Sequence, residues 1–373
     1  MDNTIIIKPV RTAAEKMAFI KFPRCIYRGD PYWVQPLIGE RKEFFHVQKN
    51  PFFEHGEVEL FLAVRHNRYV GRIAAIIDHH YNEFQNEKAG FFGCFEATAE
   101  NEVATALLDE AVHWVKNKGM NIIYGPASFT ANDEYGFLVE GFAAPPVIMM
   151  PYNPSYYPGL IEQYGFRKAR DLMAYFLSDD GPVPERIVRI SERLRRRKEI
   201  QLRIIDMKRL DREIKIIKML FNKVLENIWG FVPLTDKEID RLAAHLKKIV
   251  VPELVIFAEI DRDPVGFIMS LPDINQVLIH LHGRLFPTGI FKAFRYGRKI
   301  NRVRVISMGV LPGYRKWGIE TLLYTETIKK GTRLGYHGAE LSFVLEDNMM
   351  MNRAARALGA NLYKKYRIYQ KSL

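Results

Sequence analysis

The sequence predicts an α/β (α+β) protein built from two domains. Its length of 373 residues exceeds what a single hydrophobic core usually serves. A pattern also occurs twice, because Ala63 to Gly71 and Ala258 to Gly266 have the same spacing, and each lies in two apolar runs around a polar turn. Such runs predict an antiparallel hairpin in each half.

The periodicity of apolar residues predicts further elements around these hairpins. We expect helices over 101–118, 185–199, 211–228, 235–249, 318–334 and 348–358, and strands over 121–124 and 339–345. Thr235 is the expected N-cap of its helix. Gly and Pro punctuate 178–184, which predicts a boundary there. The predicted domains are 1–178 and 200–373, joined by a linker with a basic helix over 179–199.

Residues 306–323 form the most informative segment. A short apolar strand ends at Pro312, a basic turn with a glycine follows, and a helix begins near Ile319. Such a turn directs successive backbone N–H groups to one place, at the positive end of a helix dipole. The segment therefore predicts a phosphate-binding turn.

This segment resembles the acyl-CoA-binding segment of the GNAT acyltransferase superfamily, Val-x-Pro-x-x-[Arg/Gln]-x-x-Gly-x-[Gly/Ala]. Val310, Pro312, Arg315 and Gly318 match that pattern, whereas Glu320 replaces the small residue. The resemblance implies two tandem GNAT-like domains, each a mixed, mostly antiparallel sheet flanked by helices. The chain is also similar to bacterial ceramide-synthase-type N-acyltransferases, and residues 27–34, 132–134 and 341–348 carry that similarity.

The resemblance also implies the co-substrate and the residues that hold it. The co-substrate is acetyl-CoA or a longer acyl-CoA. The expected cofactor-binding residues are Met308, Gly309, Val310, Arg315, Lys316, Trp317, Gly318, Ile319, Glu320, Thr321 and Asn348. The corresponding stretch of the first half, 93–100, has two acidic residues and no basic one, so we expect no cofactor site there.

The candidate catalytic residues follow the last predicted strands. Glu346 can draw a proton from the amine through a water, while Asn348 either holds a ligand or only caps the next helix. The position at which the family often has its tyrosine acid is Ala355 in this chain. Tyr363 and Tyr366 are therefore the expected substitutes, unless they occupy alternate faces of a last strand.

Two further groups of residues suggest binding. Asn132, Asp133 and Glu134 lie in a polar loop that is either a substrate clamp or an Asx-turn. The segment 284–299 separates aromatic from basic residues, which suits a membrane interface, the mouth of an acyl tunnel or a lid over the core. The histidine pairs His79–His80 and His280–His282 lack a third ligand at suitable spacing, so we expect no metal.

Composition limits the partners and the compartment. Hydrophobic residues make up 48% and charged residues 26%, as in soluble globular proteins. No apolar stretch approaches the ~20 residues of a spanning helix, and no basic segment precedes Ile5–Ile7, so we expect neither membrane span nor signal peptide. Two cysteines give no disulfide framework. We expect a cytoplasmic protein, able to bind peripherally at the inner face of the membrane.

The expected function is N-acyl transfer from acyl-CoA to a small-molecule or lipid amine. The net charge of +12 favours anionic partners, such as CoA phosphates or an anionic membrane surface. Nucleic acid is not expected, because no nucleic-acid-binding motif accompanies the charge. The alternative is a non-catalytic, GNAT-derived protein that binds a membrane surface or a protein partner.

Overall fold

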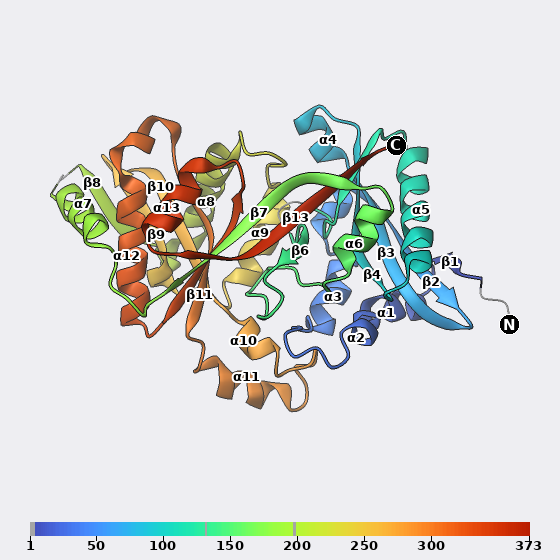
Figure 1. The fold of residues 1–373 in the computed structure, drawn as a ribbon. Helices are drawn as coiled ribbons and strands as arrows, with labels where there is room; N and C mark the ends of the chain where they lie inside the picture. Colours follow the sequence, from blue (N-terminus) through green and yellow to red (C-terminus); the bar gives the residue numbers. More distant parts are fainter. Residues whose placement is uncertain (1–3, 131–132, 197–198) are drawn as a thin grey trace. The chain divides into compact units, whose positions relative to one another are not determined.

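The computed structural model describes residues 4–130, 133–196 and 199–373, and these residues form two compact units (Figure 1). The first unit comprises Met1–Leu172, Val277–Phe294 and Lys364–Leu373, and the second comprises Met173–Gln276 and Arg295–Tyr363. Two segments from the C-terminal half of the sequence therefore belong to the first unit.

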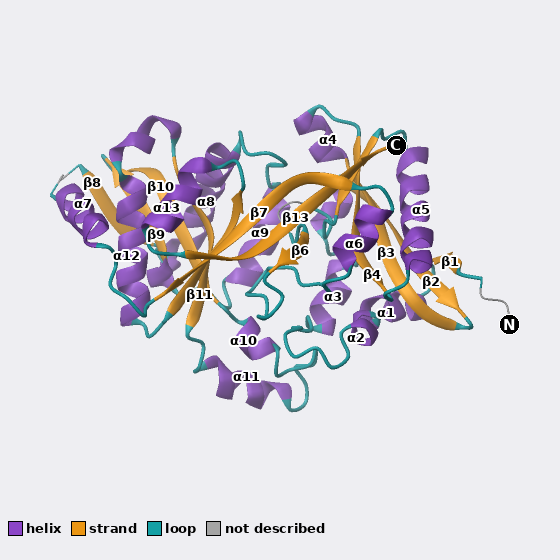
Figure 2. Ribbon diagram, viewed as in Figure 1, coloured by secondary structure: helices purple, strands orange, loops and turns teal. Residues whose placement is uncertain are grey.

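The first unit is a mixed sheet with helices beside it (Figure 2). Its elements are β1 (Ile6–Pro9), α1 (Ala13–Lys21), α2 (Pro23–Ile26), α3 (Ile38–Phe44), η1 (Pro51–Glu54), β2 (Gly56–Arg65), β3 (Arg68–Asp78), α4 (His79–Gln85), β4 (Ala89–Ala97), α5 (Asn101–Asn117), β5 (Ile122–Gly125), β6 (Phe137–Glu140) and α6 (Tyr157–Gln163). Strands β7 (Arg167–Ser178) and β13 (Asn361–Ser372) and helices α10 (Asn275–Leu278) and α11 (Gly289–Gly297) each have residues in both units. The strand order is β1-β2-β3-β4-β5-β13, with only β4 and β5 parallel, and β6 pairs with β13.

The second unit repeats this arrangement. Its elements are α7 (Glu185–Arg195), β8 (Ile200–Ile204), η2 (Met207–Arg209), α8 (Leu210–Leu225), α9 (Asp236–Leu246), η3 (Pro252–Leu254), β9 (Val255–Ile260), β10 (Asp263–Pro272), β11 (Arg302–Val310), η4 (Pro312–Trp317), α12 (Ile319–Arg333), β12 (Gly338–Leu345) and α13 (Met349–Ala357). The strand order is β8-β9-β10-β11-β12, and only β11 and β12 are parallel. The strands of both units belong to one 13-stranded sheet, in which β7 links β13 to β12. The predicted fold class, mixed and mostly antiparallel β-structure flanked by helices in each unit, is confirmed.

The two predicted hairpins are confirmed as β2–β3 and β9–β10. Ala63 pairs directly with Gly71, and Ala258 with Gly266. A Cβ atom at Gly71 would lie 2.6 Å from Leu107 of α5, and one at Gly266 would lie 3.0 Å from Val310. The repeated glycine therefore allows a close approach of neighbouring elements at the same place in each unit.

Both hairpin turns contain non-glycine residues with positive φ. The angle φ is 49° at His66 and 57° at Asn67 in the first unit, and 51° at Asp261 and 72° at Arg262 in the second. Turns of this kind favour Asn and Gly at both positions, because a side chain in the left-handed region is crowded by the backbone.

The turn leads to a prediction about stability. We expect Arg262→Gly to raise the free energy of unfolding by about 1 kcal/mol, because glycine relieves the left-handed conformation at that position. The shift of the urea-unfolding midpoint measures this effect. Arg68→Gly, in the regular backbone of β3, is the control and should lower stability instead; equal effects of the two variants would contradict the explanation.

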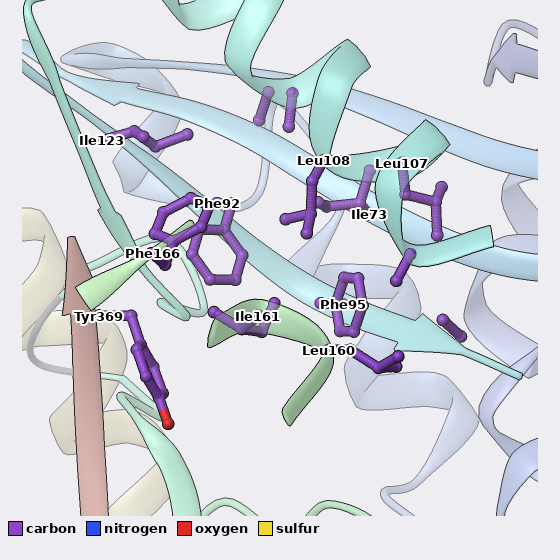
Figure 3. Packing of buried hydrophobic residues seen from close by; sticks show 14 of the residues in the cluster. Ile73, Phe92, Phe95, Leu107, Leu108, Ile123, Leu160, Ile161, Phe166 and Tyr369 are labelled. Carbon is purple, nitrogen blue, oxygen red and sulfur yellow. The ribbon is translucent and has the colours of Figure 1, made fainter. Parts of the chain in front are cut away.

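The buried core of each unit lies between its β-strands and one long helix, which is α5 in the first unit and α12 in the second. In the first unit, Ile73 and Phe92 of the sheet pack with Leu107 and Leu108 of α5 (Figure 3). In the second unit, the corresponding cluster combines sheet residues with α12 and includes Ile256, Ile268, Ile319, Leu322 and Leu323. Burial of each large apolar side chain stabilises the fold by about 1.5–3 kcal/mol.

Local sequence signals explain several helix ends. Thr235 caps α9 through a capping box with Glu238, as its position before the helix predicts.

Helix α7 packs along α12, where Ser191 Oγ lies 2.8 Å from Thr325 Oγ1 and Arg195 forms an ion pair with Glu326. The predicted helix over 185–199 thus ends earlier, at Arg195, and its residues 197–198 lie outside the described part of the chain.

Across residues 4–130, 133–196 and 199–373, the helices lack the combination of length and apolarity that crossing a bilayer requires.

Candidate active site

Strands β11 and β12 run parallel and part before their ends. Their pairing covers only Arg302–Val305 of β11 and Gly338–Leu341 of β12, whereas β11 continues to Val310 and β12 to Leu345. Strand β10 pairs with the other edge of β11 over this stretch. The backbone groups of residues 306–310 that face the β12 side therefore have no strand partner in the part of the chain that the structure describes.

The expected thioester-binding residues Met308, Gly309 and Val310 lie on this unpaired stretch. Gly309 and Val310 are buried and Met308 is half-buried. An extended ligand with amide groups, such as pantetheine, can bond to such an edge as an additional strand does.

A basic turn joins β11 to α12 (Figure 1). Gly318 has φ 77° and ψ 15°, and α12 begins at the next residue, Ile319. A Cβ atom at Gly318 would lie 2.7 Å from Leu194 Cδ1 of α7, so both the backbone conformation and the space require glycine. The Thr321 N–H already donates to the Gly318 carbonyl (3.0 Å), so the N–H groups that precede it, those of Ile319 and Glu320, are the ones that can bind an anion at this helix start.

The other expected cofactor-binding residues surround this turn. Lys316 is exposed, Trp317 and Thr321 are half-buried, and Ile319 is buried in the core. The Arg315 guanidinium donates from Nε to the carbonyl of Val310 (3.3 Å) and from Nη2 to that of Val224 (3.4 Å). Arg315 therefore places its charge at the end of β11 and ties that end to α8.

Glu320 occupies the position at which the GNAT pattern has a small residue. Burial raises the pKa of its carboxyl, while its own backbone N–H and the nearby Arg315 act in the opposite direction. The carboxyl lies at the first turn of α12, where its charge opposes an incoming phosphate unless Arg315 balances it.

Glu346 and Asn348 follow the end of β12. Glu346 is half-buried, and Asn348 Oδ1 accepts a hydrogen bond from Met351 N (3.2 Å), which makes Asn348 the N-cap of α13. The ends of adjacent parallel strands meet at one edge of a sheet. The structure thus brings Glu346 to the same edge of the second unit as the end of β11 and the glycine turn.

The buried side chain of Asn352 holds this loop, which was not predicted from the sequence. Asn352 Nδ2 donates to the carbonyls of Leu345 (2.9 Å) and Asn348 (2.9 Å) and lies 3.4 Å from that of Glu346. Its Oδ1 accepts from the Tyr175 hydroxyl (2.7 Å). Asn352 is 6% exposed, so a buried side chain holds the backbone on both sides of Glu346. Asn352 is a polar residue one turn into α13, and this position was the signal in the sequence that could have indicated its role.

Tyr363 belongs to a buried polar network at the point where β11 and β12 part. Its hydroxyl donates to Glu340 Oε2, and the Ser342 hydroxyl donates to Glu340 Oε1 (2.5 Å). Arg304 donates from Nε to Ser342 Oγ (3.0 Å) and stands opposite Glu340 in the strand register. Glu340 is fully buried, so this carboxylate is stabilised by these donors and not by water.

The remaining expected residues lie in the first unit. Tyr366 is fully buried in β13, where it pairs with Leu138 of β6. Asp133 Oδ2 accepts from Thr130 Oγ1 (3.3 Å), and Glu134 forms an ion pair with Arg41 (3.1 Å). Asn132 lies outside the described residues. The contacts of Asp133 with Thr130 are those of a local turn, one of the two interpretations that the sequence allows.

The first unit has a corresponding pair of parallel strands, but its strand edge is covered. Strands β4 and β5 pair over Ala89–Phe91 and Ile122–Tyr124, and β4 continues to Ala97. The Ala97 N–H donates to Tyr157 Oη (3.0 Å), and the Tyr156 hydroxyl donates to the Ala97 carbonyl (2.8 Å). Side chains of the unit itself thus occupy the backbone groups at which a ligand would bind.

The acidic residues of this stretch are neutralised by partners. Glu96 is buried, lies 3.4 Å from Arg72 and accepts from the Tyr157 hydroxyl (2.7 Å), and burial raises the pKa of its carboxyl. Glu100 forms an ion pair with Arg65 (2.7 Å). Covered backbone and paired charges, rather than free acidic side chains, therefore distinguish this edge from the open edge of β11.

Comparison with known proteins adds the family. No family model matches the chain. The chain is 36% identical to the bacterial ceramide synthase of Caulobacter vibrioides over 98% of this chain and 97% of that protein. It is also 36% identical to protein YghO of Escherichia coli over 98% of this chain and 95% of that protein. A tandem GNAT protein from the clavulanic acid biosynthesis pathway superposes over 99% of this chain and 98% of its own, with a TM-score of 0.58 and 10% identity.

The strand arrangement repeated in both units, the parting strands and the glycine turn define a tandem GNAT-fold protein, and the structural comparison confirms this class. The sequence comparison is more specific. At 36% identity over nearly its whole length, the chain belongs to the same family as the bacterial ceramide synthase and protein YghO. Fold and family together support an N-acyltransferase.

Proposed function

We propose that the chain transfers an acyl group from acyl-CoA to the amino group of an acceptor, and that the second unit binds the CoA. The observation that carries the proposal is the unpaired edge of β11 leading directly into the Gly318 turn. This arrangement offers backbone partners for pantetheine and, one turn later, N–H donors for pyrophosphate.

The basic residues nearby fit a ligand that carries phosphates. Lys316 is exposed on the turn, and Leu194 of α7 contacts Gly318, which brings the arginine-rich end of α7 to the same place. Arg193 and Arg196 are exposed there. Positive side chains beside a helix N-terminus favour phosphate binding.

The residues of the chain also suit the chemistry of amide formation. Acyl-CoA supplies the acyl group as a thioester. Glu346 is the proposed general base, which takes the proton that the acceptor ammonium or amine must lose. Tyr363 is the proposed proton donor to the leaving sulfur. In that role its hydroxyl breaks its hydrogen bond to the Glu340 carboxylate and donates to the sulfur instead. Tyr366 has no such part in this proposal, because it is fully buried in the first unit.

The acceptor that we favour is a lipid amine, with a small-molecule amine as the alternative. Support comes from the relative that is named a ceramide synthase, an enzyme type whose product contains an amide-linked acyl chain. A lipid acceptor also suits a long-chain acyl-CoA as the donor, since both then reside at a membrane surface, where we propose that the protein works peripherally.

Calorimetry of the full chain with acetyl-CoA, palmitoyl-CoA and free CoA tests the co-substrate. We expect binding of all three, because the proposed contacts are made to pantetheine and phosphates that they share, and tighter binding of palmitoyl-CoA. Failure of all three to bind would favour the non-catalytic alternative. Binding without any transfer to a long-chain amino alcohol or to small amines would favour it as well.

A further inference from the structure

A run of large apolar side chains lies exposed in residues 285–294, at and before α11. The exposed fractions are 79% for Phe291, 72% for Phe286, 66% for Phe294, 43% for Ile290 and 38% for Leu285. Half of the ten residues in this stretch are thus large hydrophobic residues in contact with water. Single exposed apolar residues are common on proteins, but a contiguous group marks an interaction surface.

The segment that carries this surface is held in place by its other residues. Leu281 is buried, the carbonyl of Gly283 accepts from Ile38 N (3.1 Å), and Lys292 Nζ donates to the carbonyl of His280 (3.1 Å). Phe291 and Phe294 lie three residues apart on α11 and so project from one face of the helix. A lid that packs its aromatic side chains into the core would bury these residues, and the structure exposes them.

The charged side chains of the segment itself all have one sign. Residues 284–300 contain five basic side chains, at Arg284, Lys292, Arg295, Arg298 and Lys299, and no acidic one. Aromatic side chains on a helix face with basic neighbours are the combination that binds an anionic lipid surface: the rings enter the boundary between headgroups and acyl chains while the cations meet the headgroups. A neutral lipid surface would bind the aromatic side chains but would offer no partner to the basic ones.

We propose that residues 285–294, with the basic side chains that flank them, dock the protein onto an anionic lipid bilayer. The surface recognises anionic headgroups through charge and the acyl-chain region through Phe286, Phe291 and Phe294. The inference deepens the proposed function by naming the partner, and binding to lipid needs no acyl-CoA. Loss of lipid binding and loss of acyl transfer can therefore be distinguished by experiment.

Flotation with vesicles tests the proposal. The full chain should float with phosphatidylglycerol–phosphatidylcholine vesicles in ~0.1 M salt, stay down with pure phosphatidylcholine, and be released in ~1 M salt, at which the Debye length falls to about 3 Å. Phe291→Ser with Phe294→Ser should lower the vesicle partition coefficient at least about tenfold, since each ring then loses its apolar contact. Tyr69→Ser with Phe84→Ser, which removes two exposed rings elsewhere in the first unit, should leave it unchanged.

A measurement on the unaltered chain guards against misfolding of the variants. Amide hydrogen exchange of residues 285–297 should slow when anionic vesicles are added. The proposal is overturned if the wild type does not float, if both double variants lose binding equally, or if vesicles leave exchange in this segment unchanged. It is also overturned if single-stranded RNA, and not the vesicles, protects the segment.

Discussion

Replacement of Glu346 by glutamine is expected to lower the acyl-transfer rate about 100-fold or more while CoA affinity is kept. Glutamine preserves the size of the side chain and its hydrogen bonding but cannot accept the proton from the amine. Asn352 fixes the backbone on either side of residue 346, so the loop should keep its conformation in the variant. Steady-state rates with palmitoyl-CoA and a long-chain amino alcohol, together with calorimetric CoA affinities, measure the two effects separately.

The adjacent carboxylate provides the matched control. Asp347 is exposed in the same loop, and Asp347→Asn removes the same charge one residue away. We expect its rate to stay within a few-fold of wild type. An unchanged rate for Glu346→Gln, or an equal loss in both variants, would reduce Glu346 to a structural residue and leave the base unassigned.

Gly318→Asp is expected to abolish CoA binding, because it places a carboxylate where the phosphates would meet the first N–H groups of α12. The structure adds a second consequence. Residue 318 has φ 77°, and its Cβ atom would lie 2.7 Å from Leu194, so the variant should also unfold at a lower temperature. Calorimetry with CoA measures the binding, and thermal unfolding measures the accompanying loss of stability.

A milder change separates these two effects. Lys316→Glu reverses an exposed charge on the turn and should weaken CoA binding about tenfold without changing thermal unfolding. Lys329→Glu makes the same reversal farther along α12 and should leave affinity near that of wild type. If CoA slows amide exchange at residues 93–105 rather than at 312–322, the second unit is the wrong site.

The parts of the fold that sequence predicted well are those set by local patterns. The segments with equal spacing, Ala63–Gly71 and Ala258–Gly266, form two hairpins with the same register, and Thr235 caps its helix as expected. The helices expected over 101–118, 318–334 and 348–358 correspond to α5, α12 and α13 to within a residue or two. The domain boundaries and the site residues stay predictions.

The features that sequence did not predict depend on contacts between distant segments. Glu340 and Ser342 alternate with apolar residues, which is typical of a solvated strand face, yet Arg304 and Tyr363 complete a buried network around them. The sequence pattern of α11 is compatible with a buried lid and with an exposed interface, so it did not predict whether Phe291 is exposed. Only the packing of the chain decides between such alternatives.

The covered strand edge of the first unit has a consequence for substitutions in this part of the chain. Tyr156 and Tyr157 bond to the backbone of Ala97, and Glu96 bonds to Tyr157 and Arg72, so replacing one of these side chains leaves a buried partner unsatisfied. Uncovering the backbone of Ala97 would need several substitutions made together, each unfavourable alone. We therefore expect single substitutions in this network to lower the free energy of unfolding, and libraries of single substitutions in the first half to yield no CoA site there.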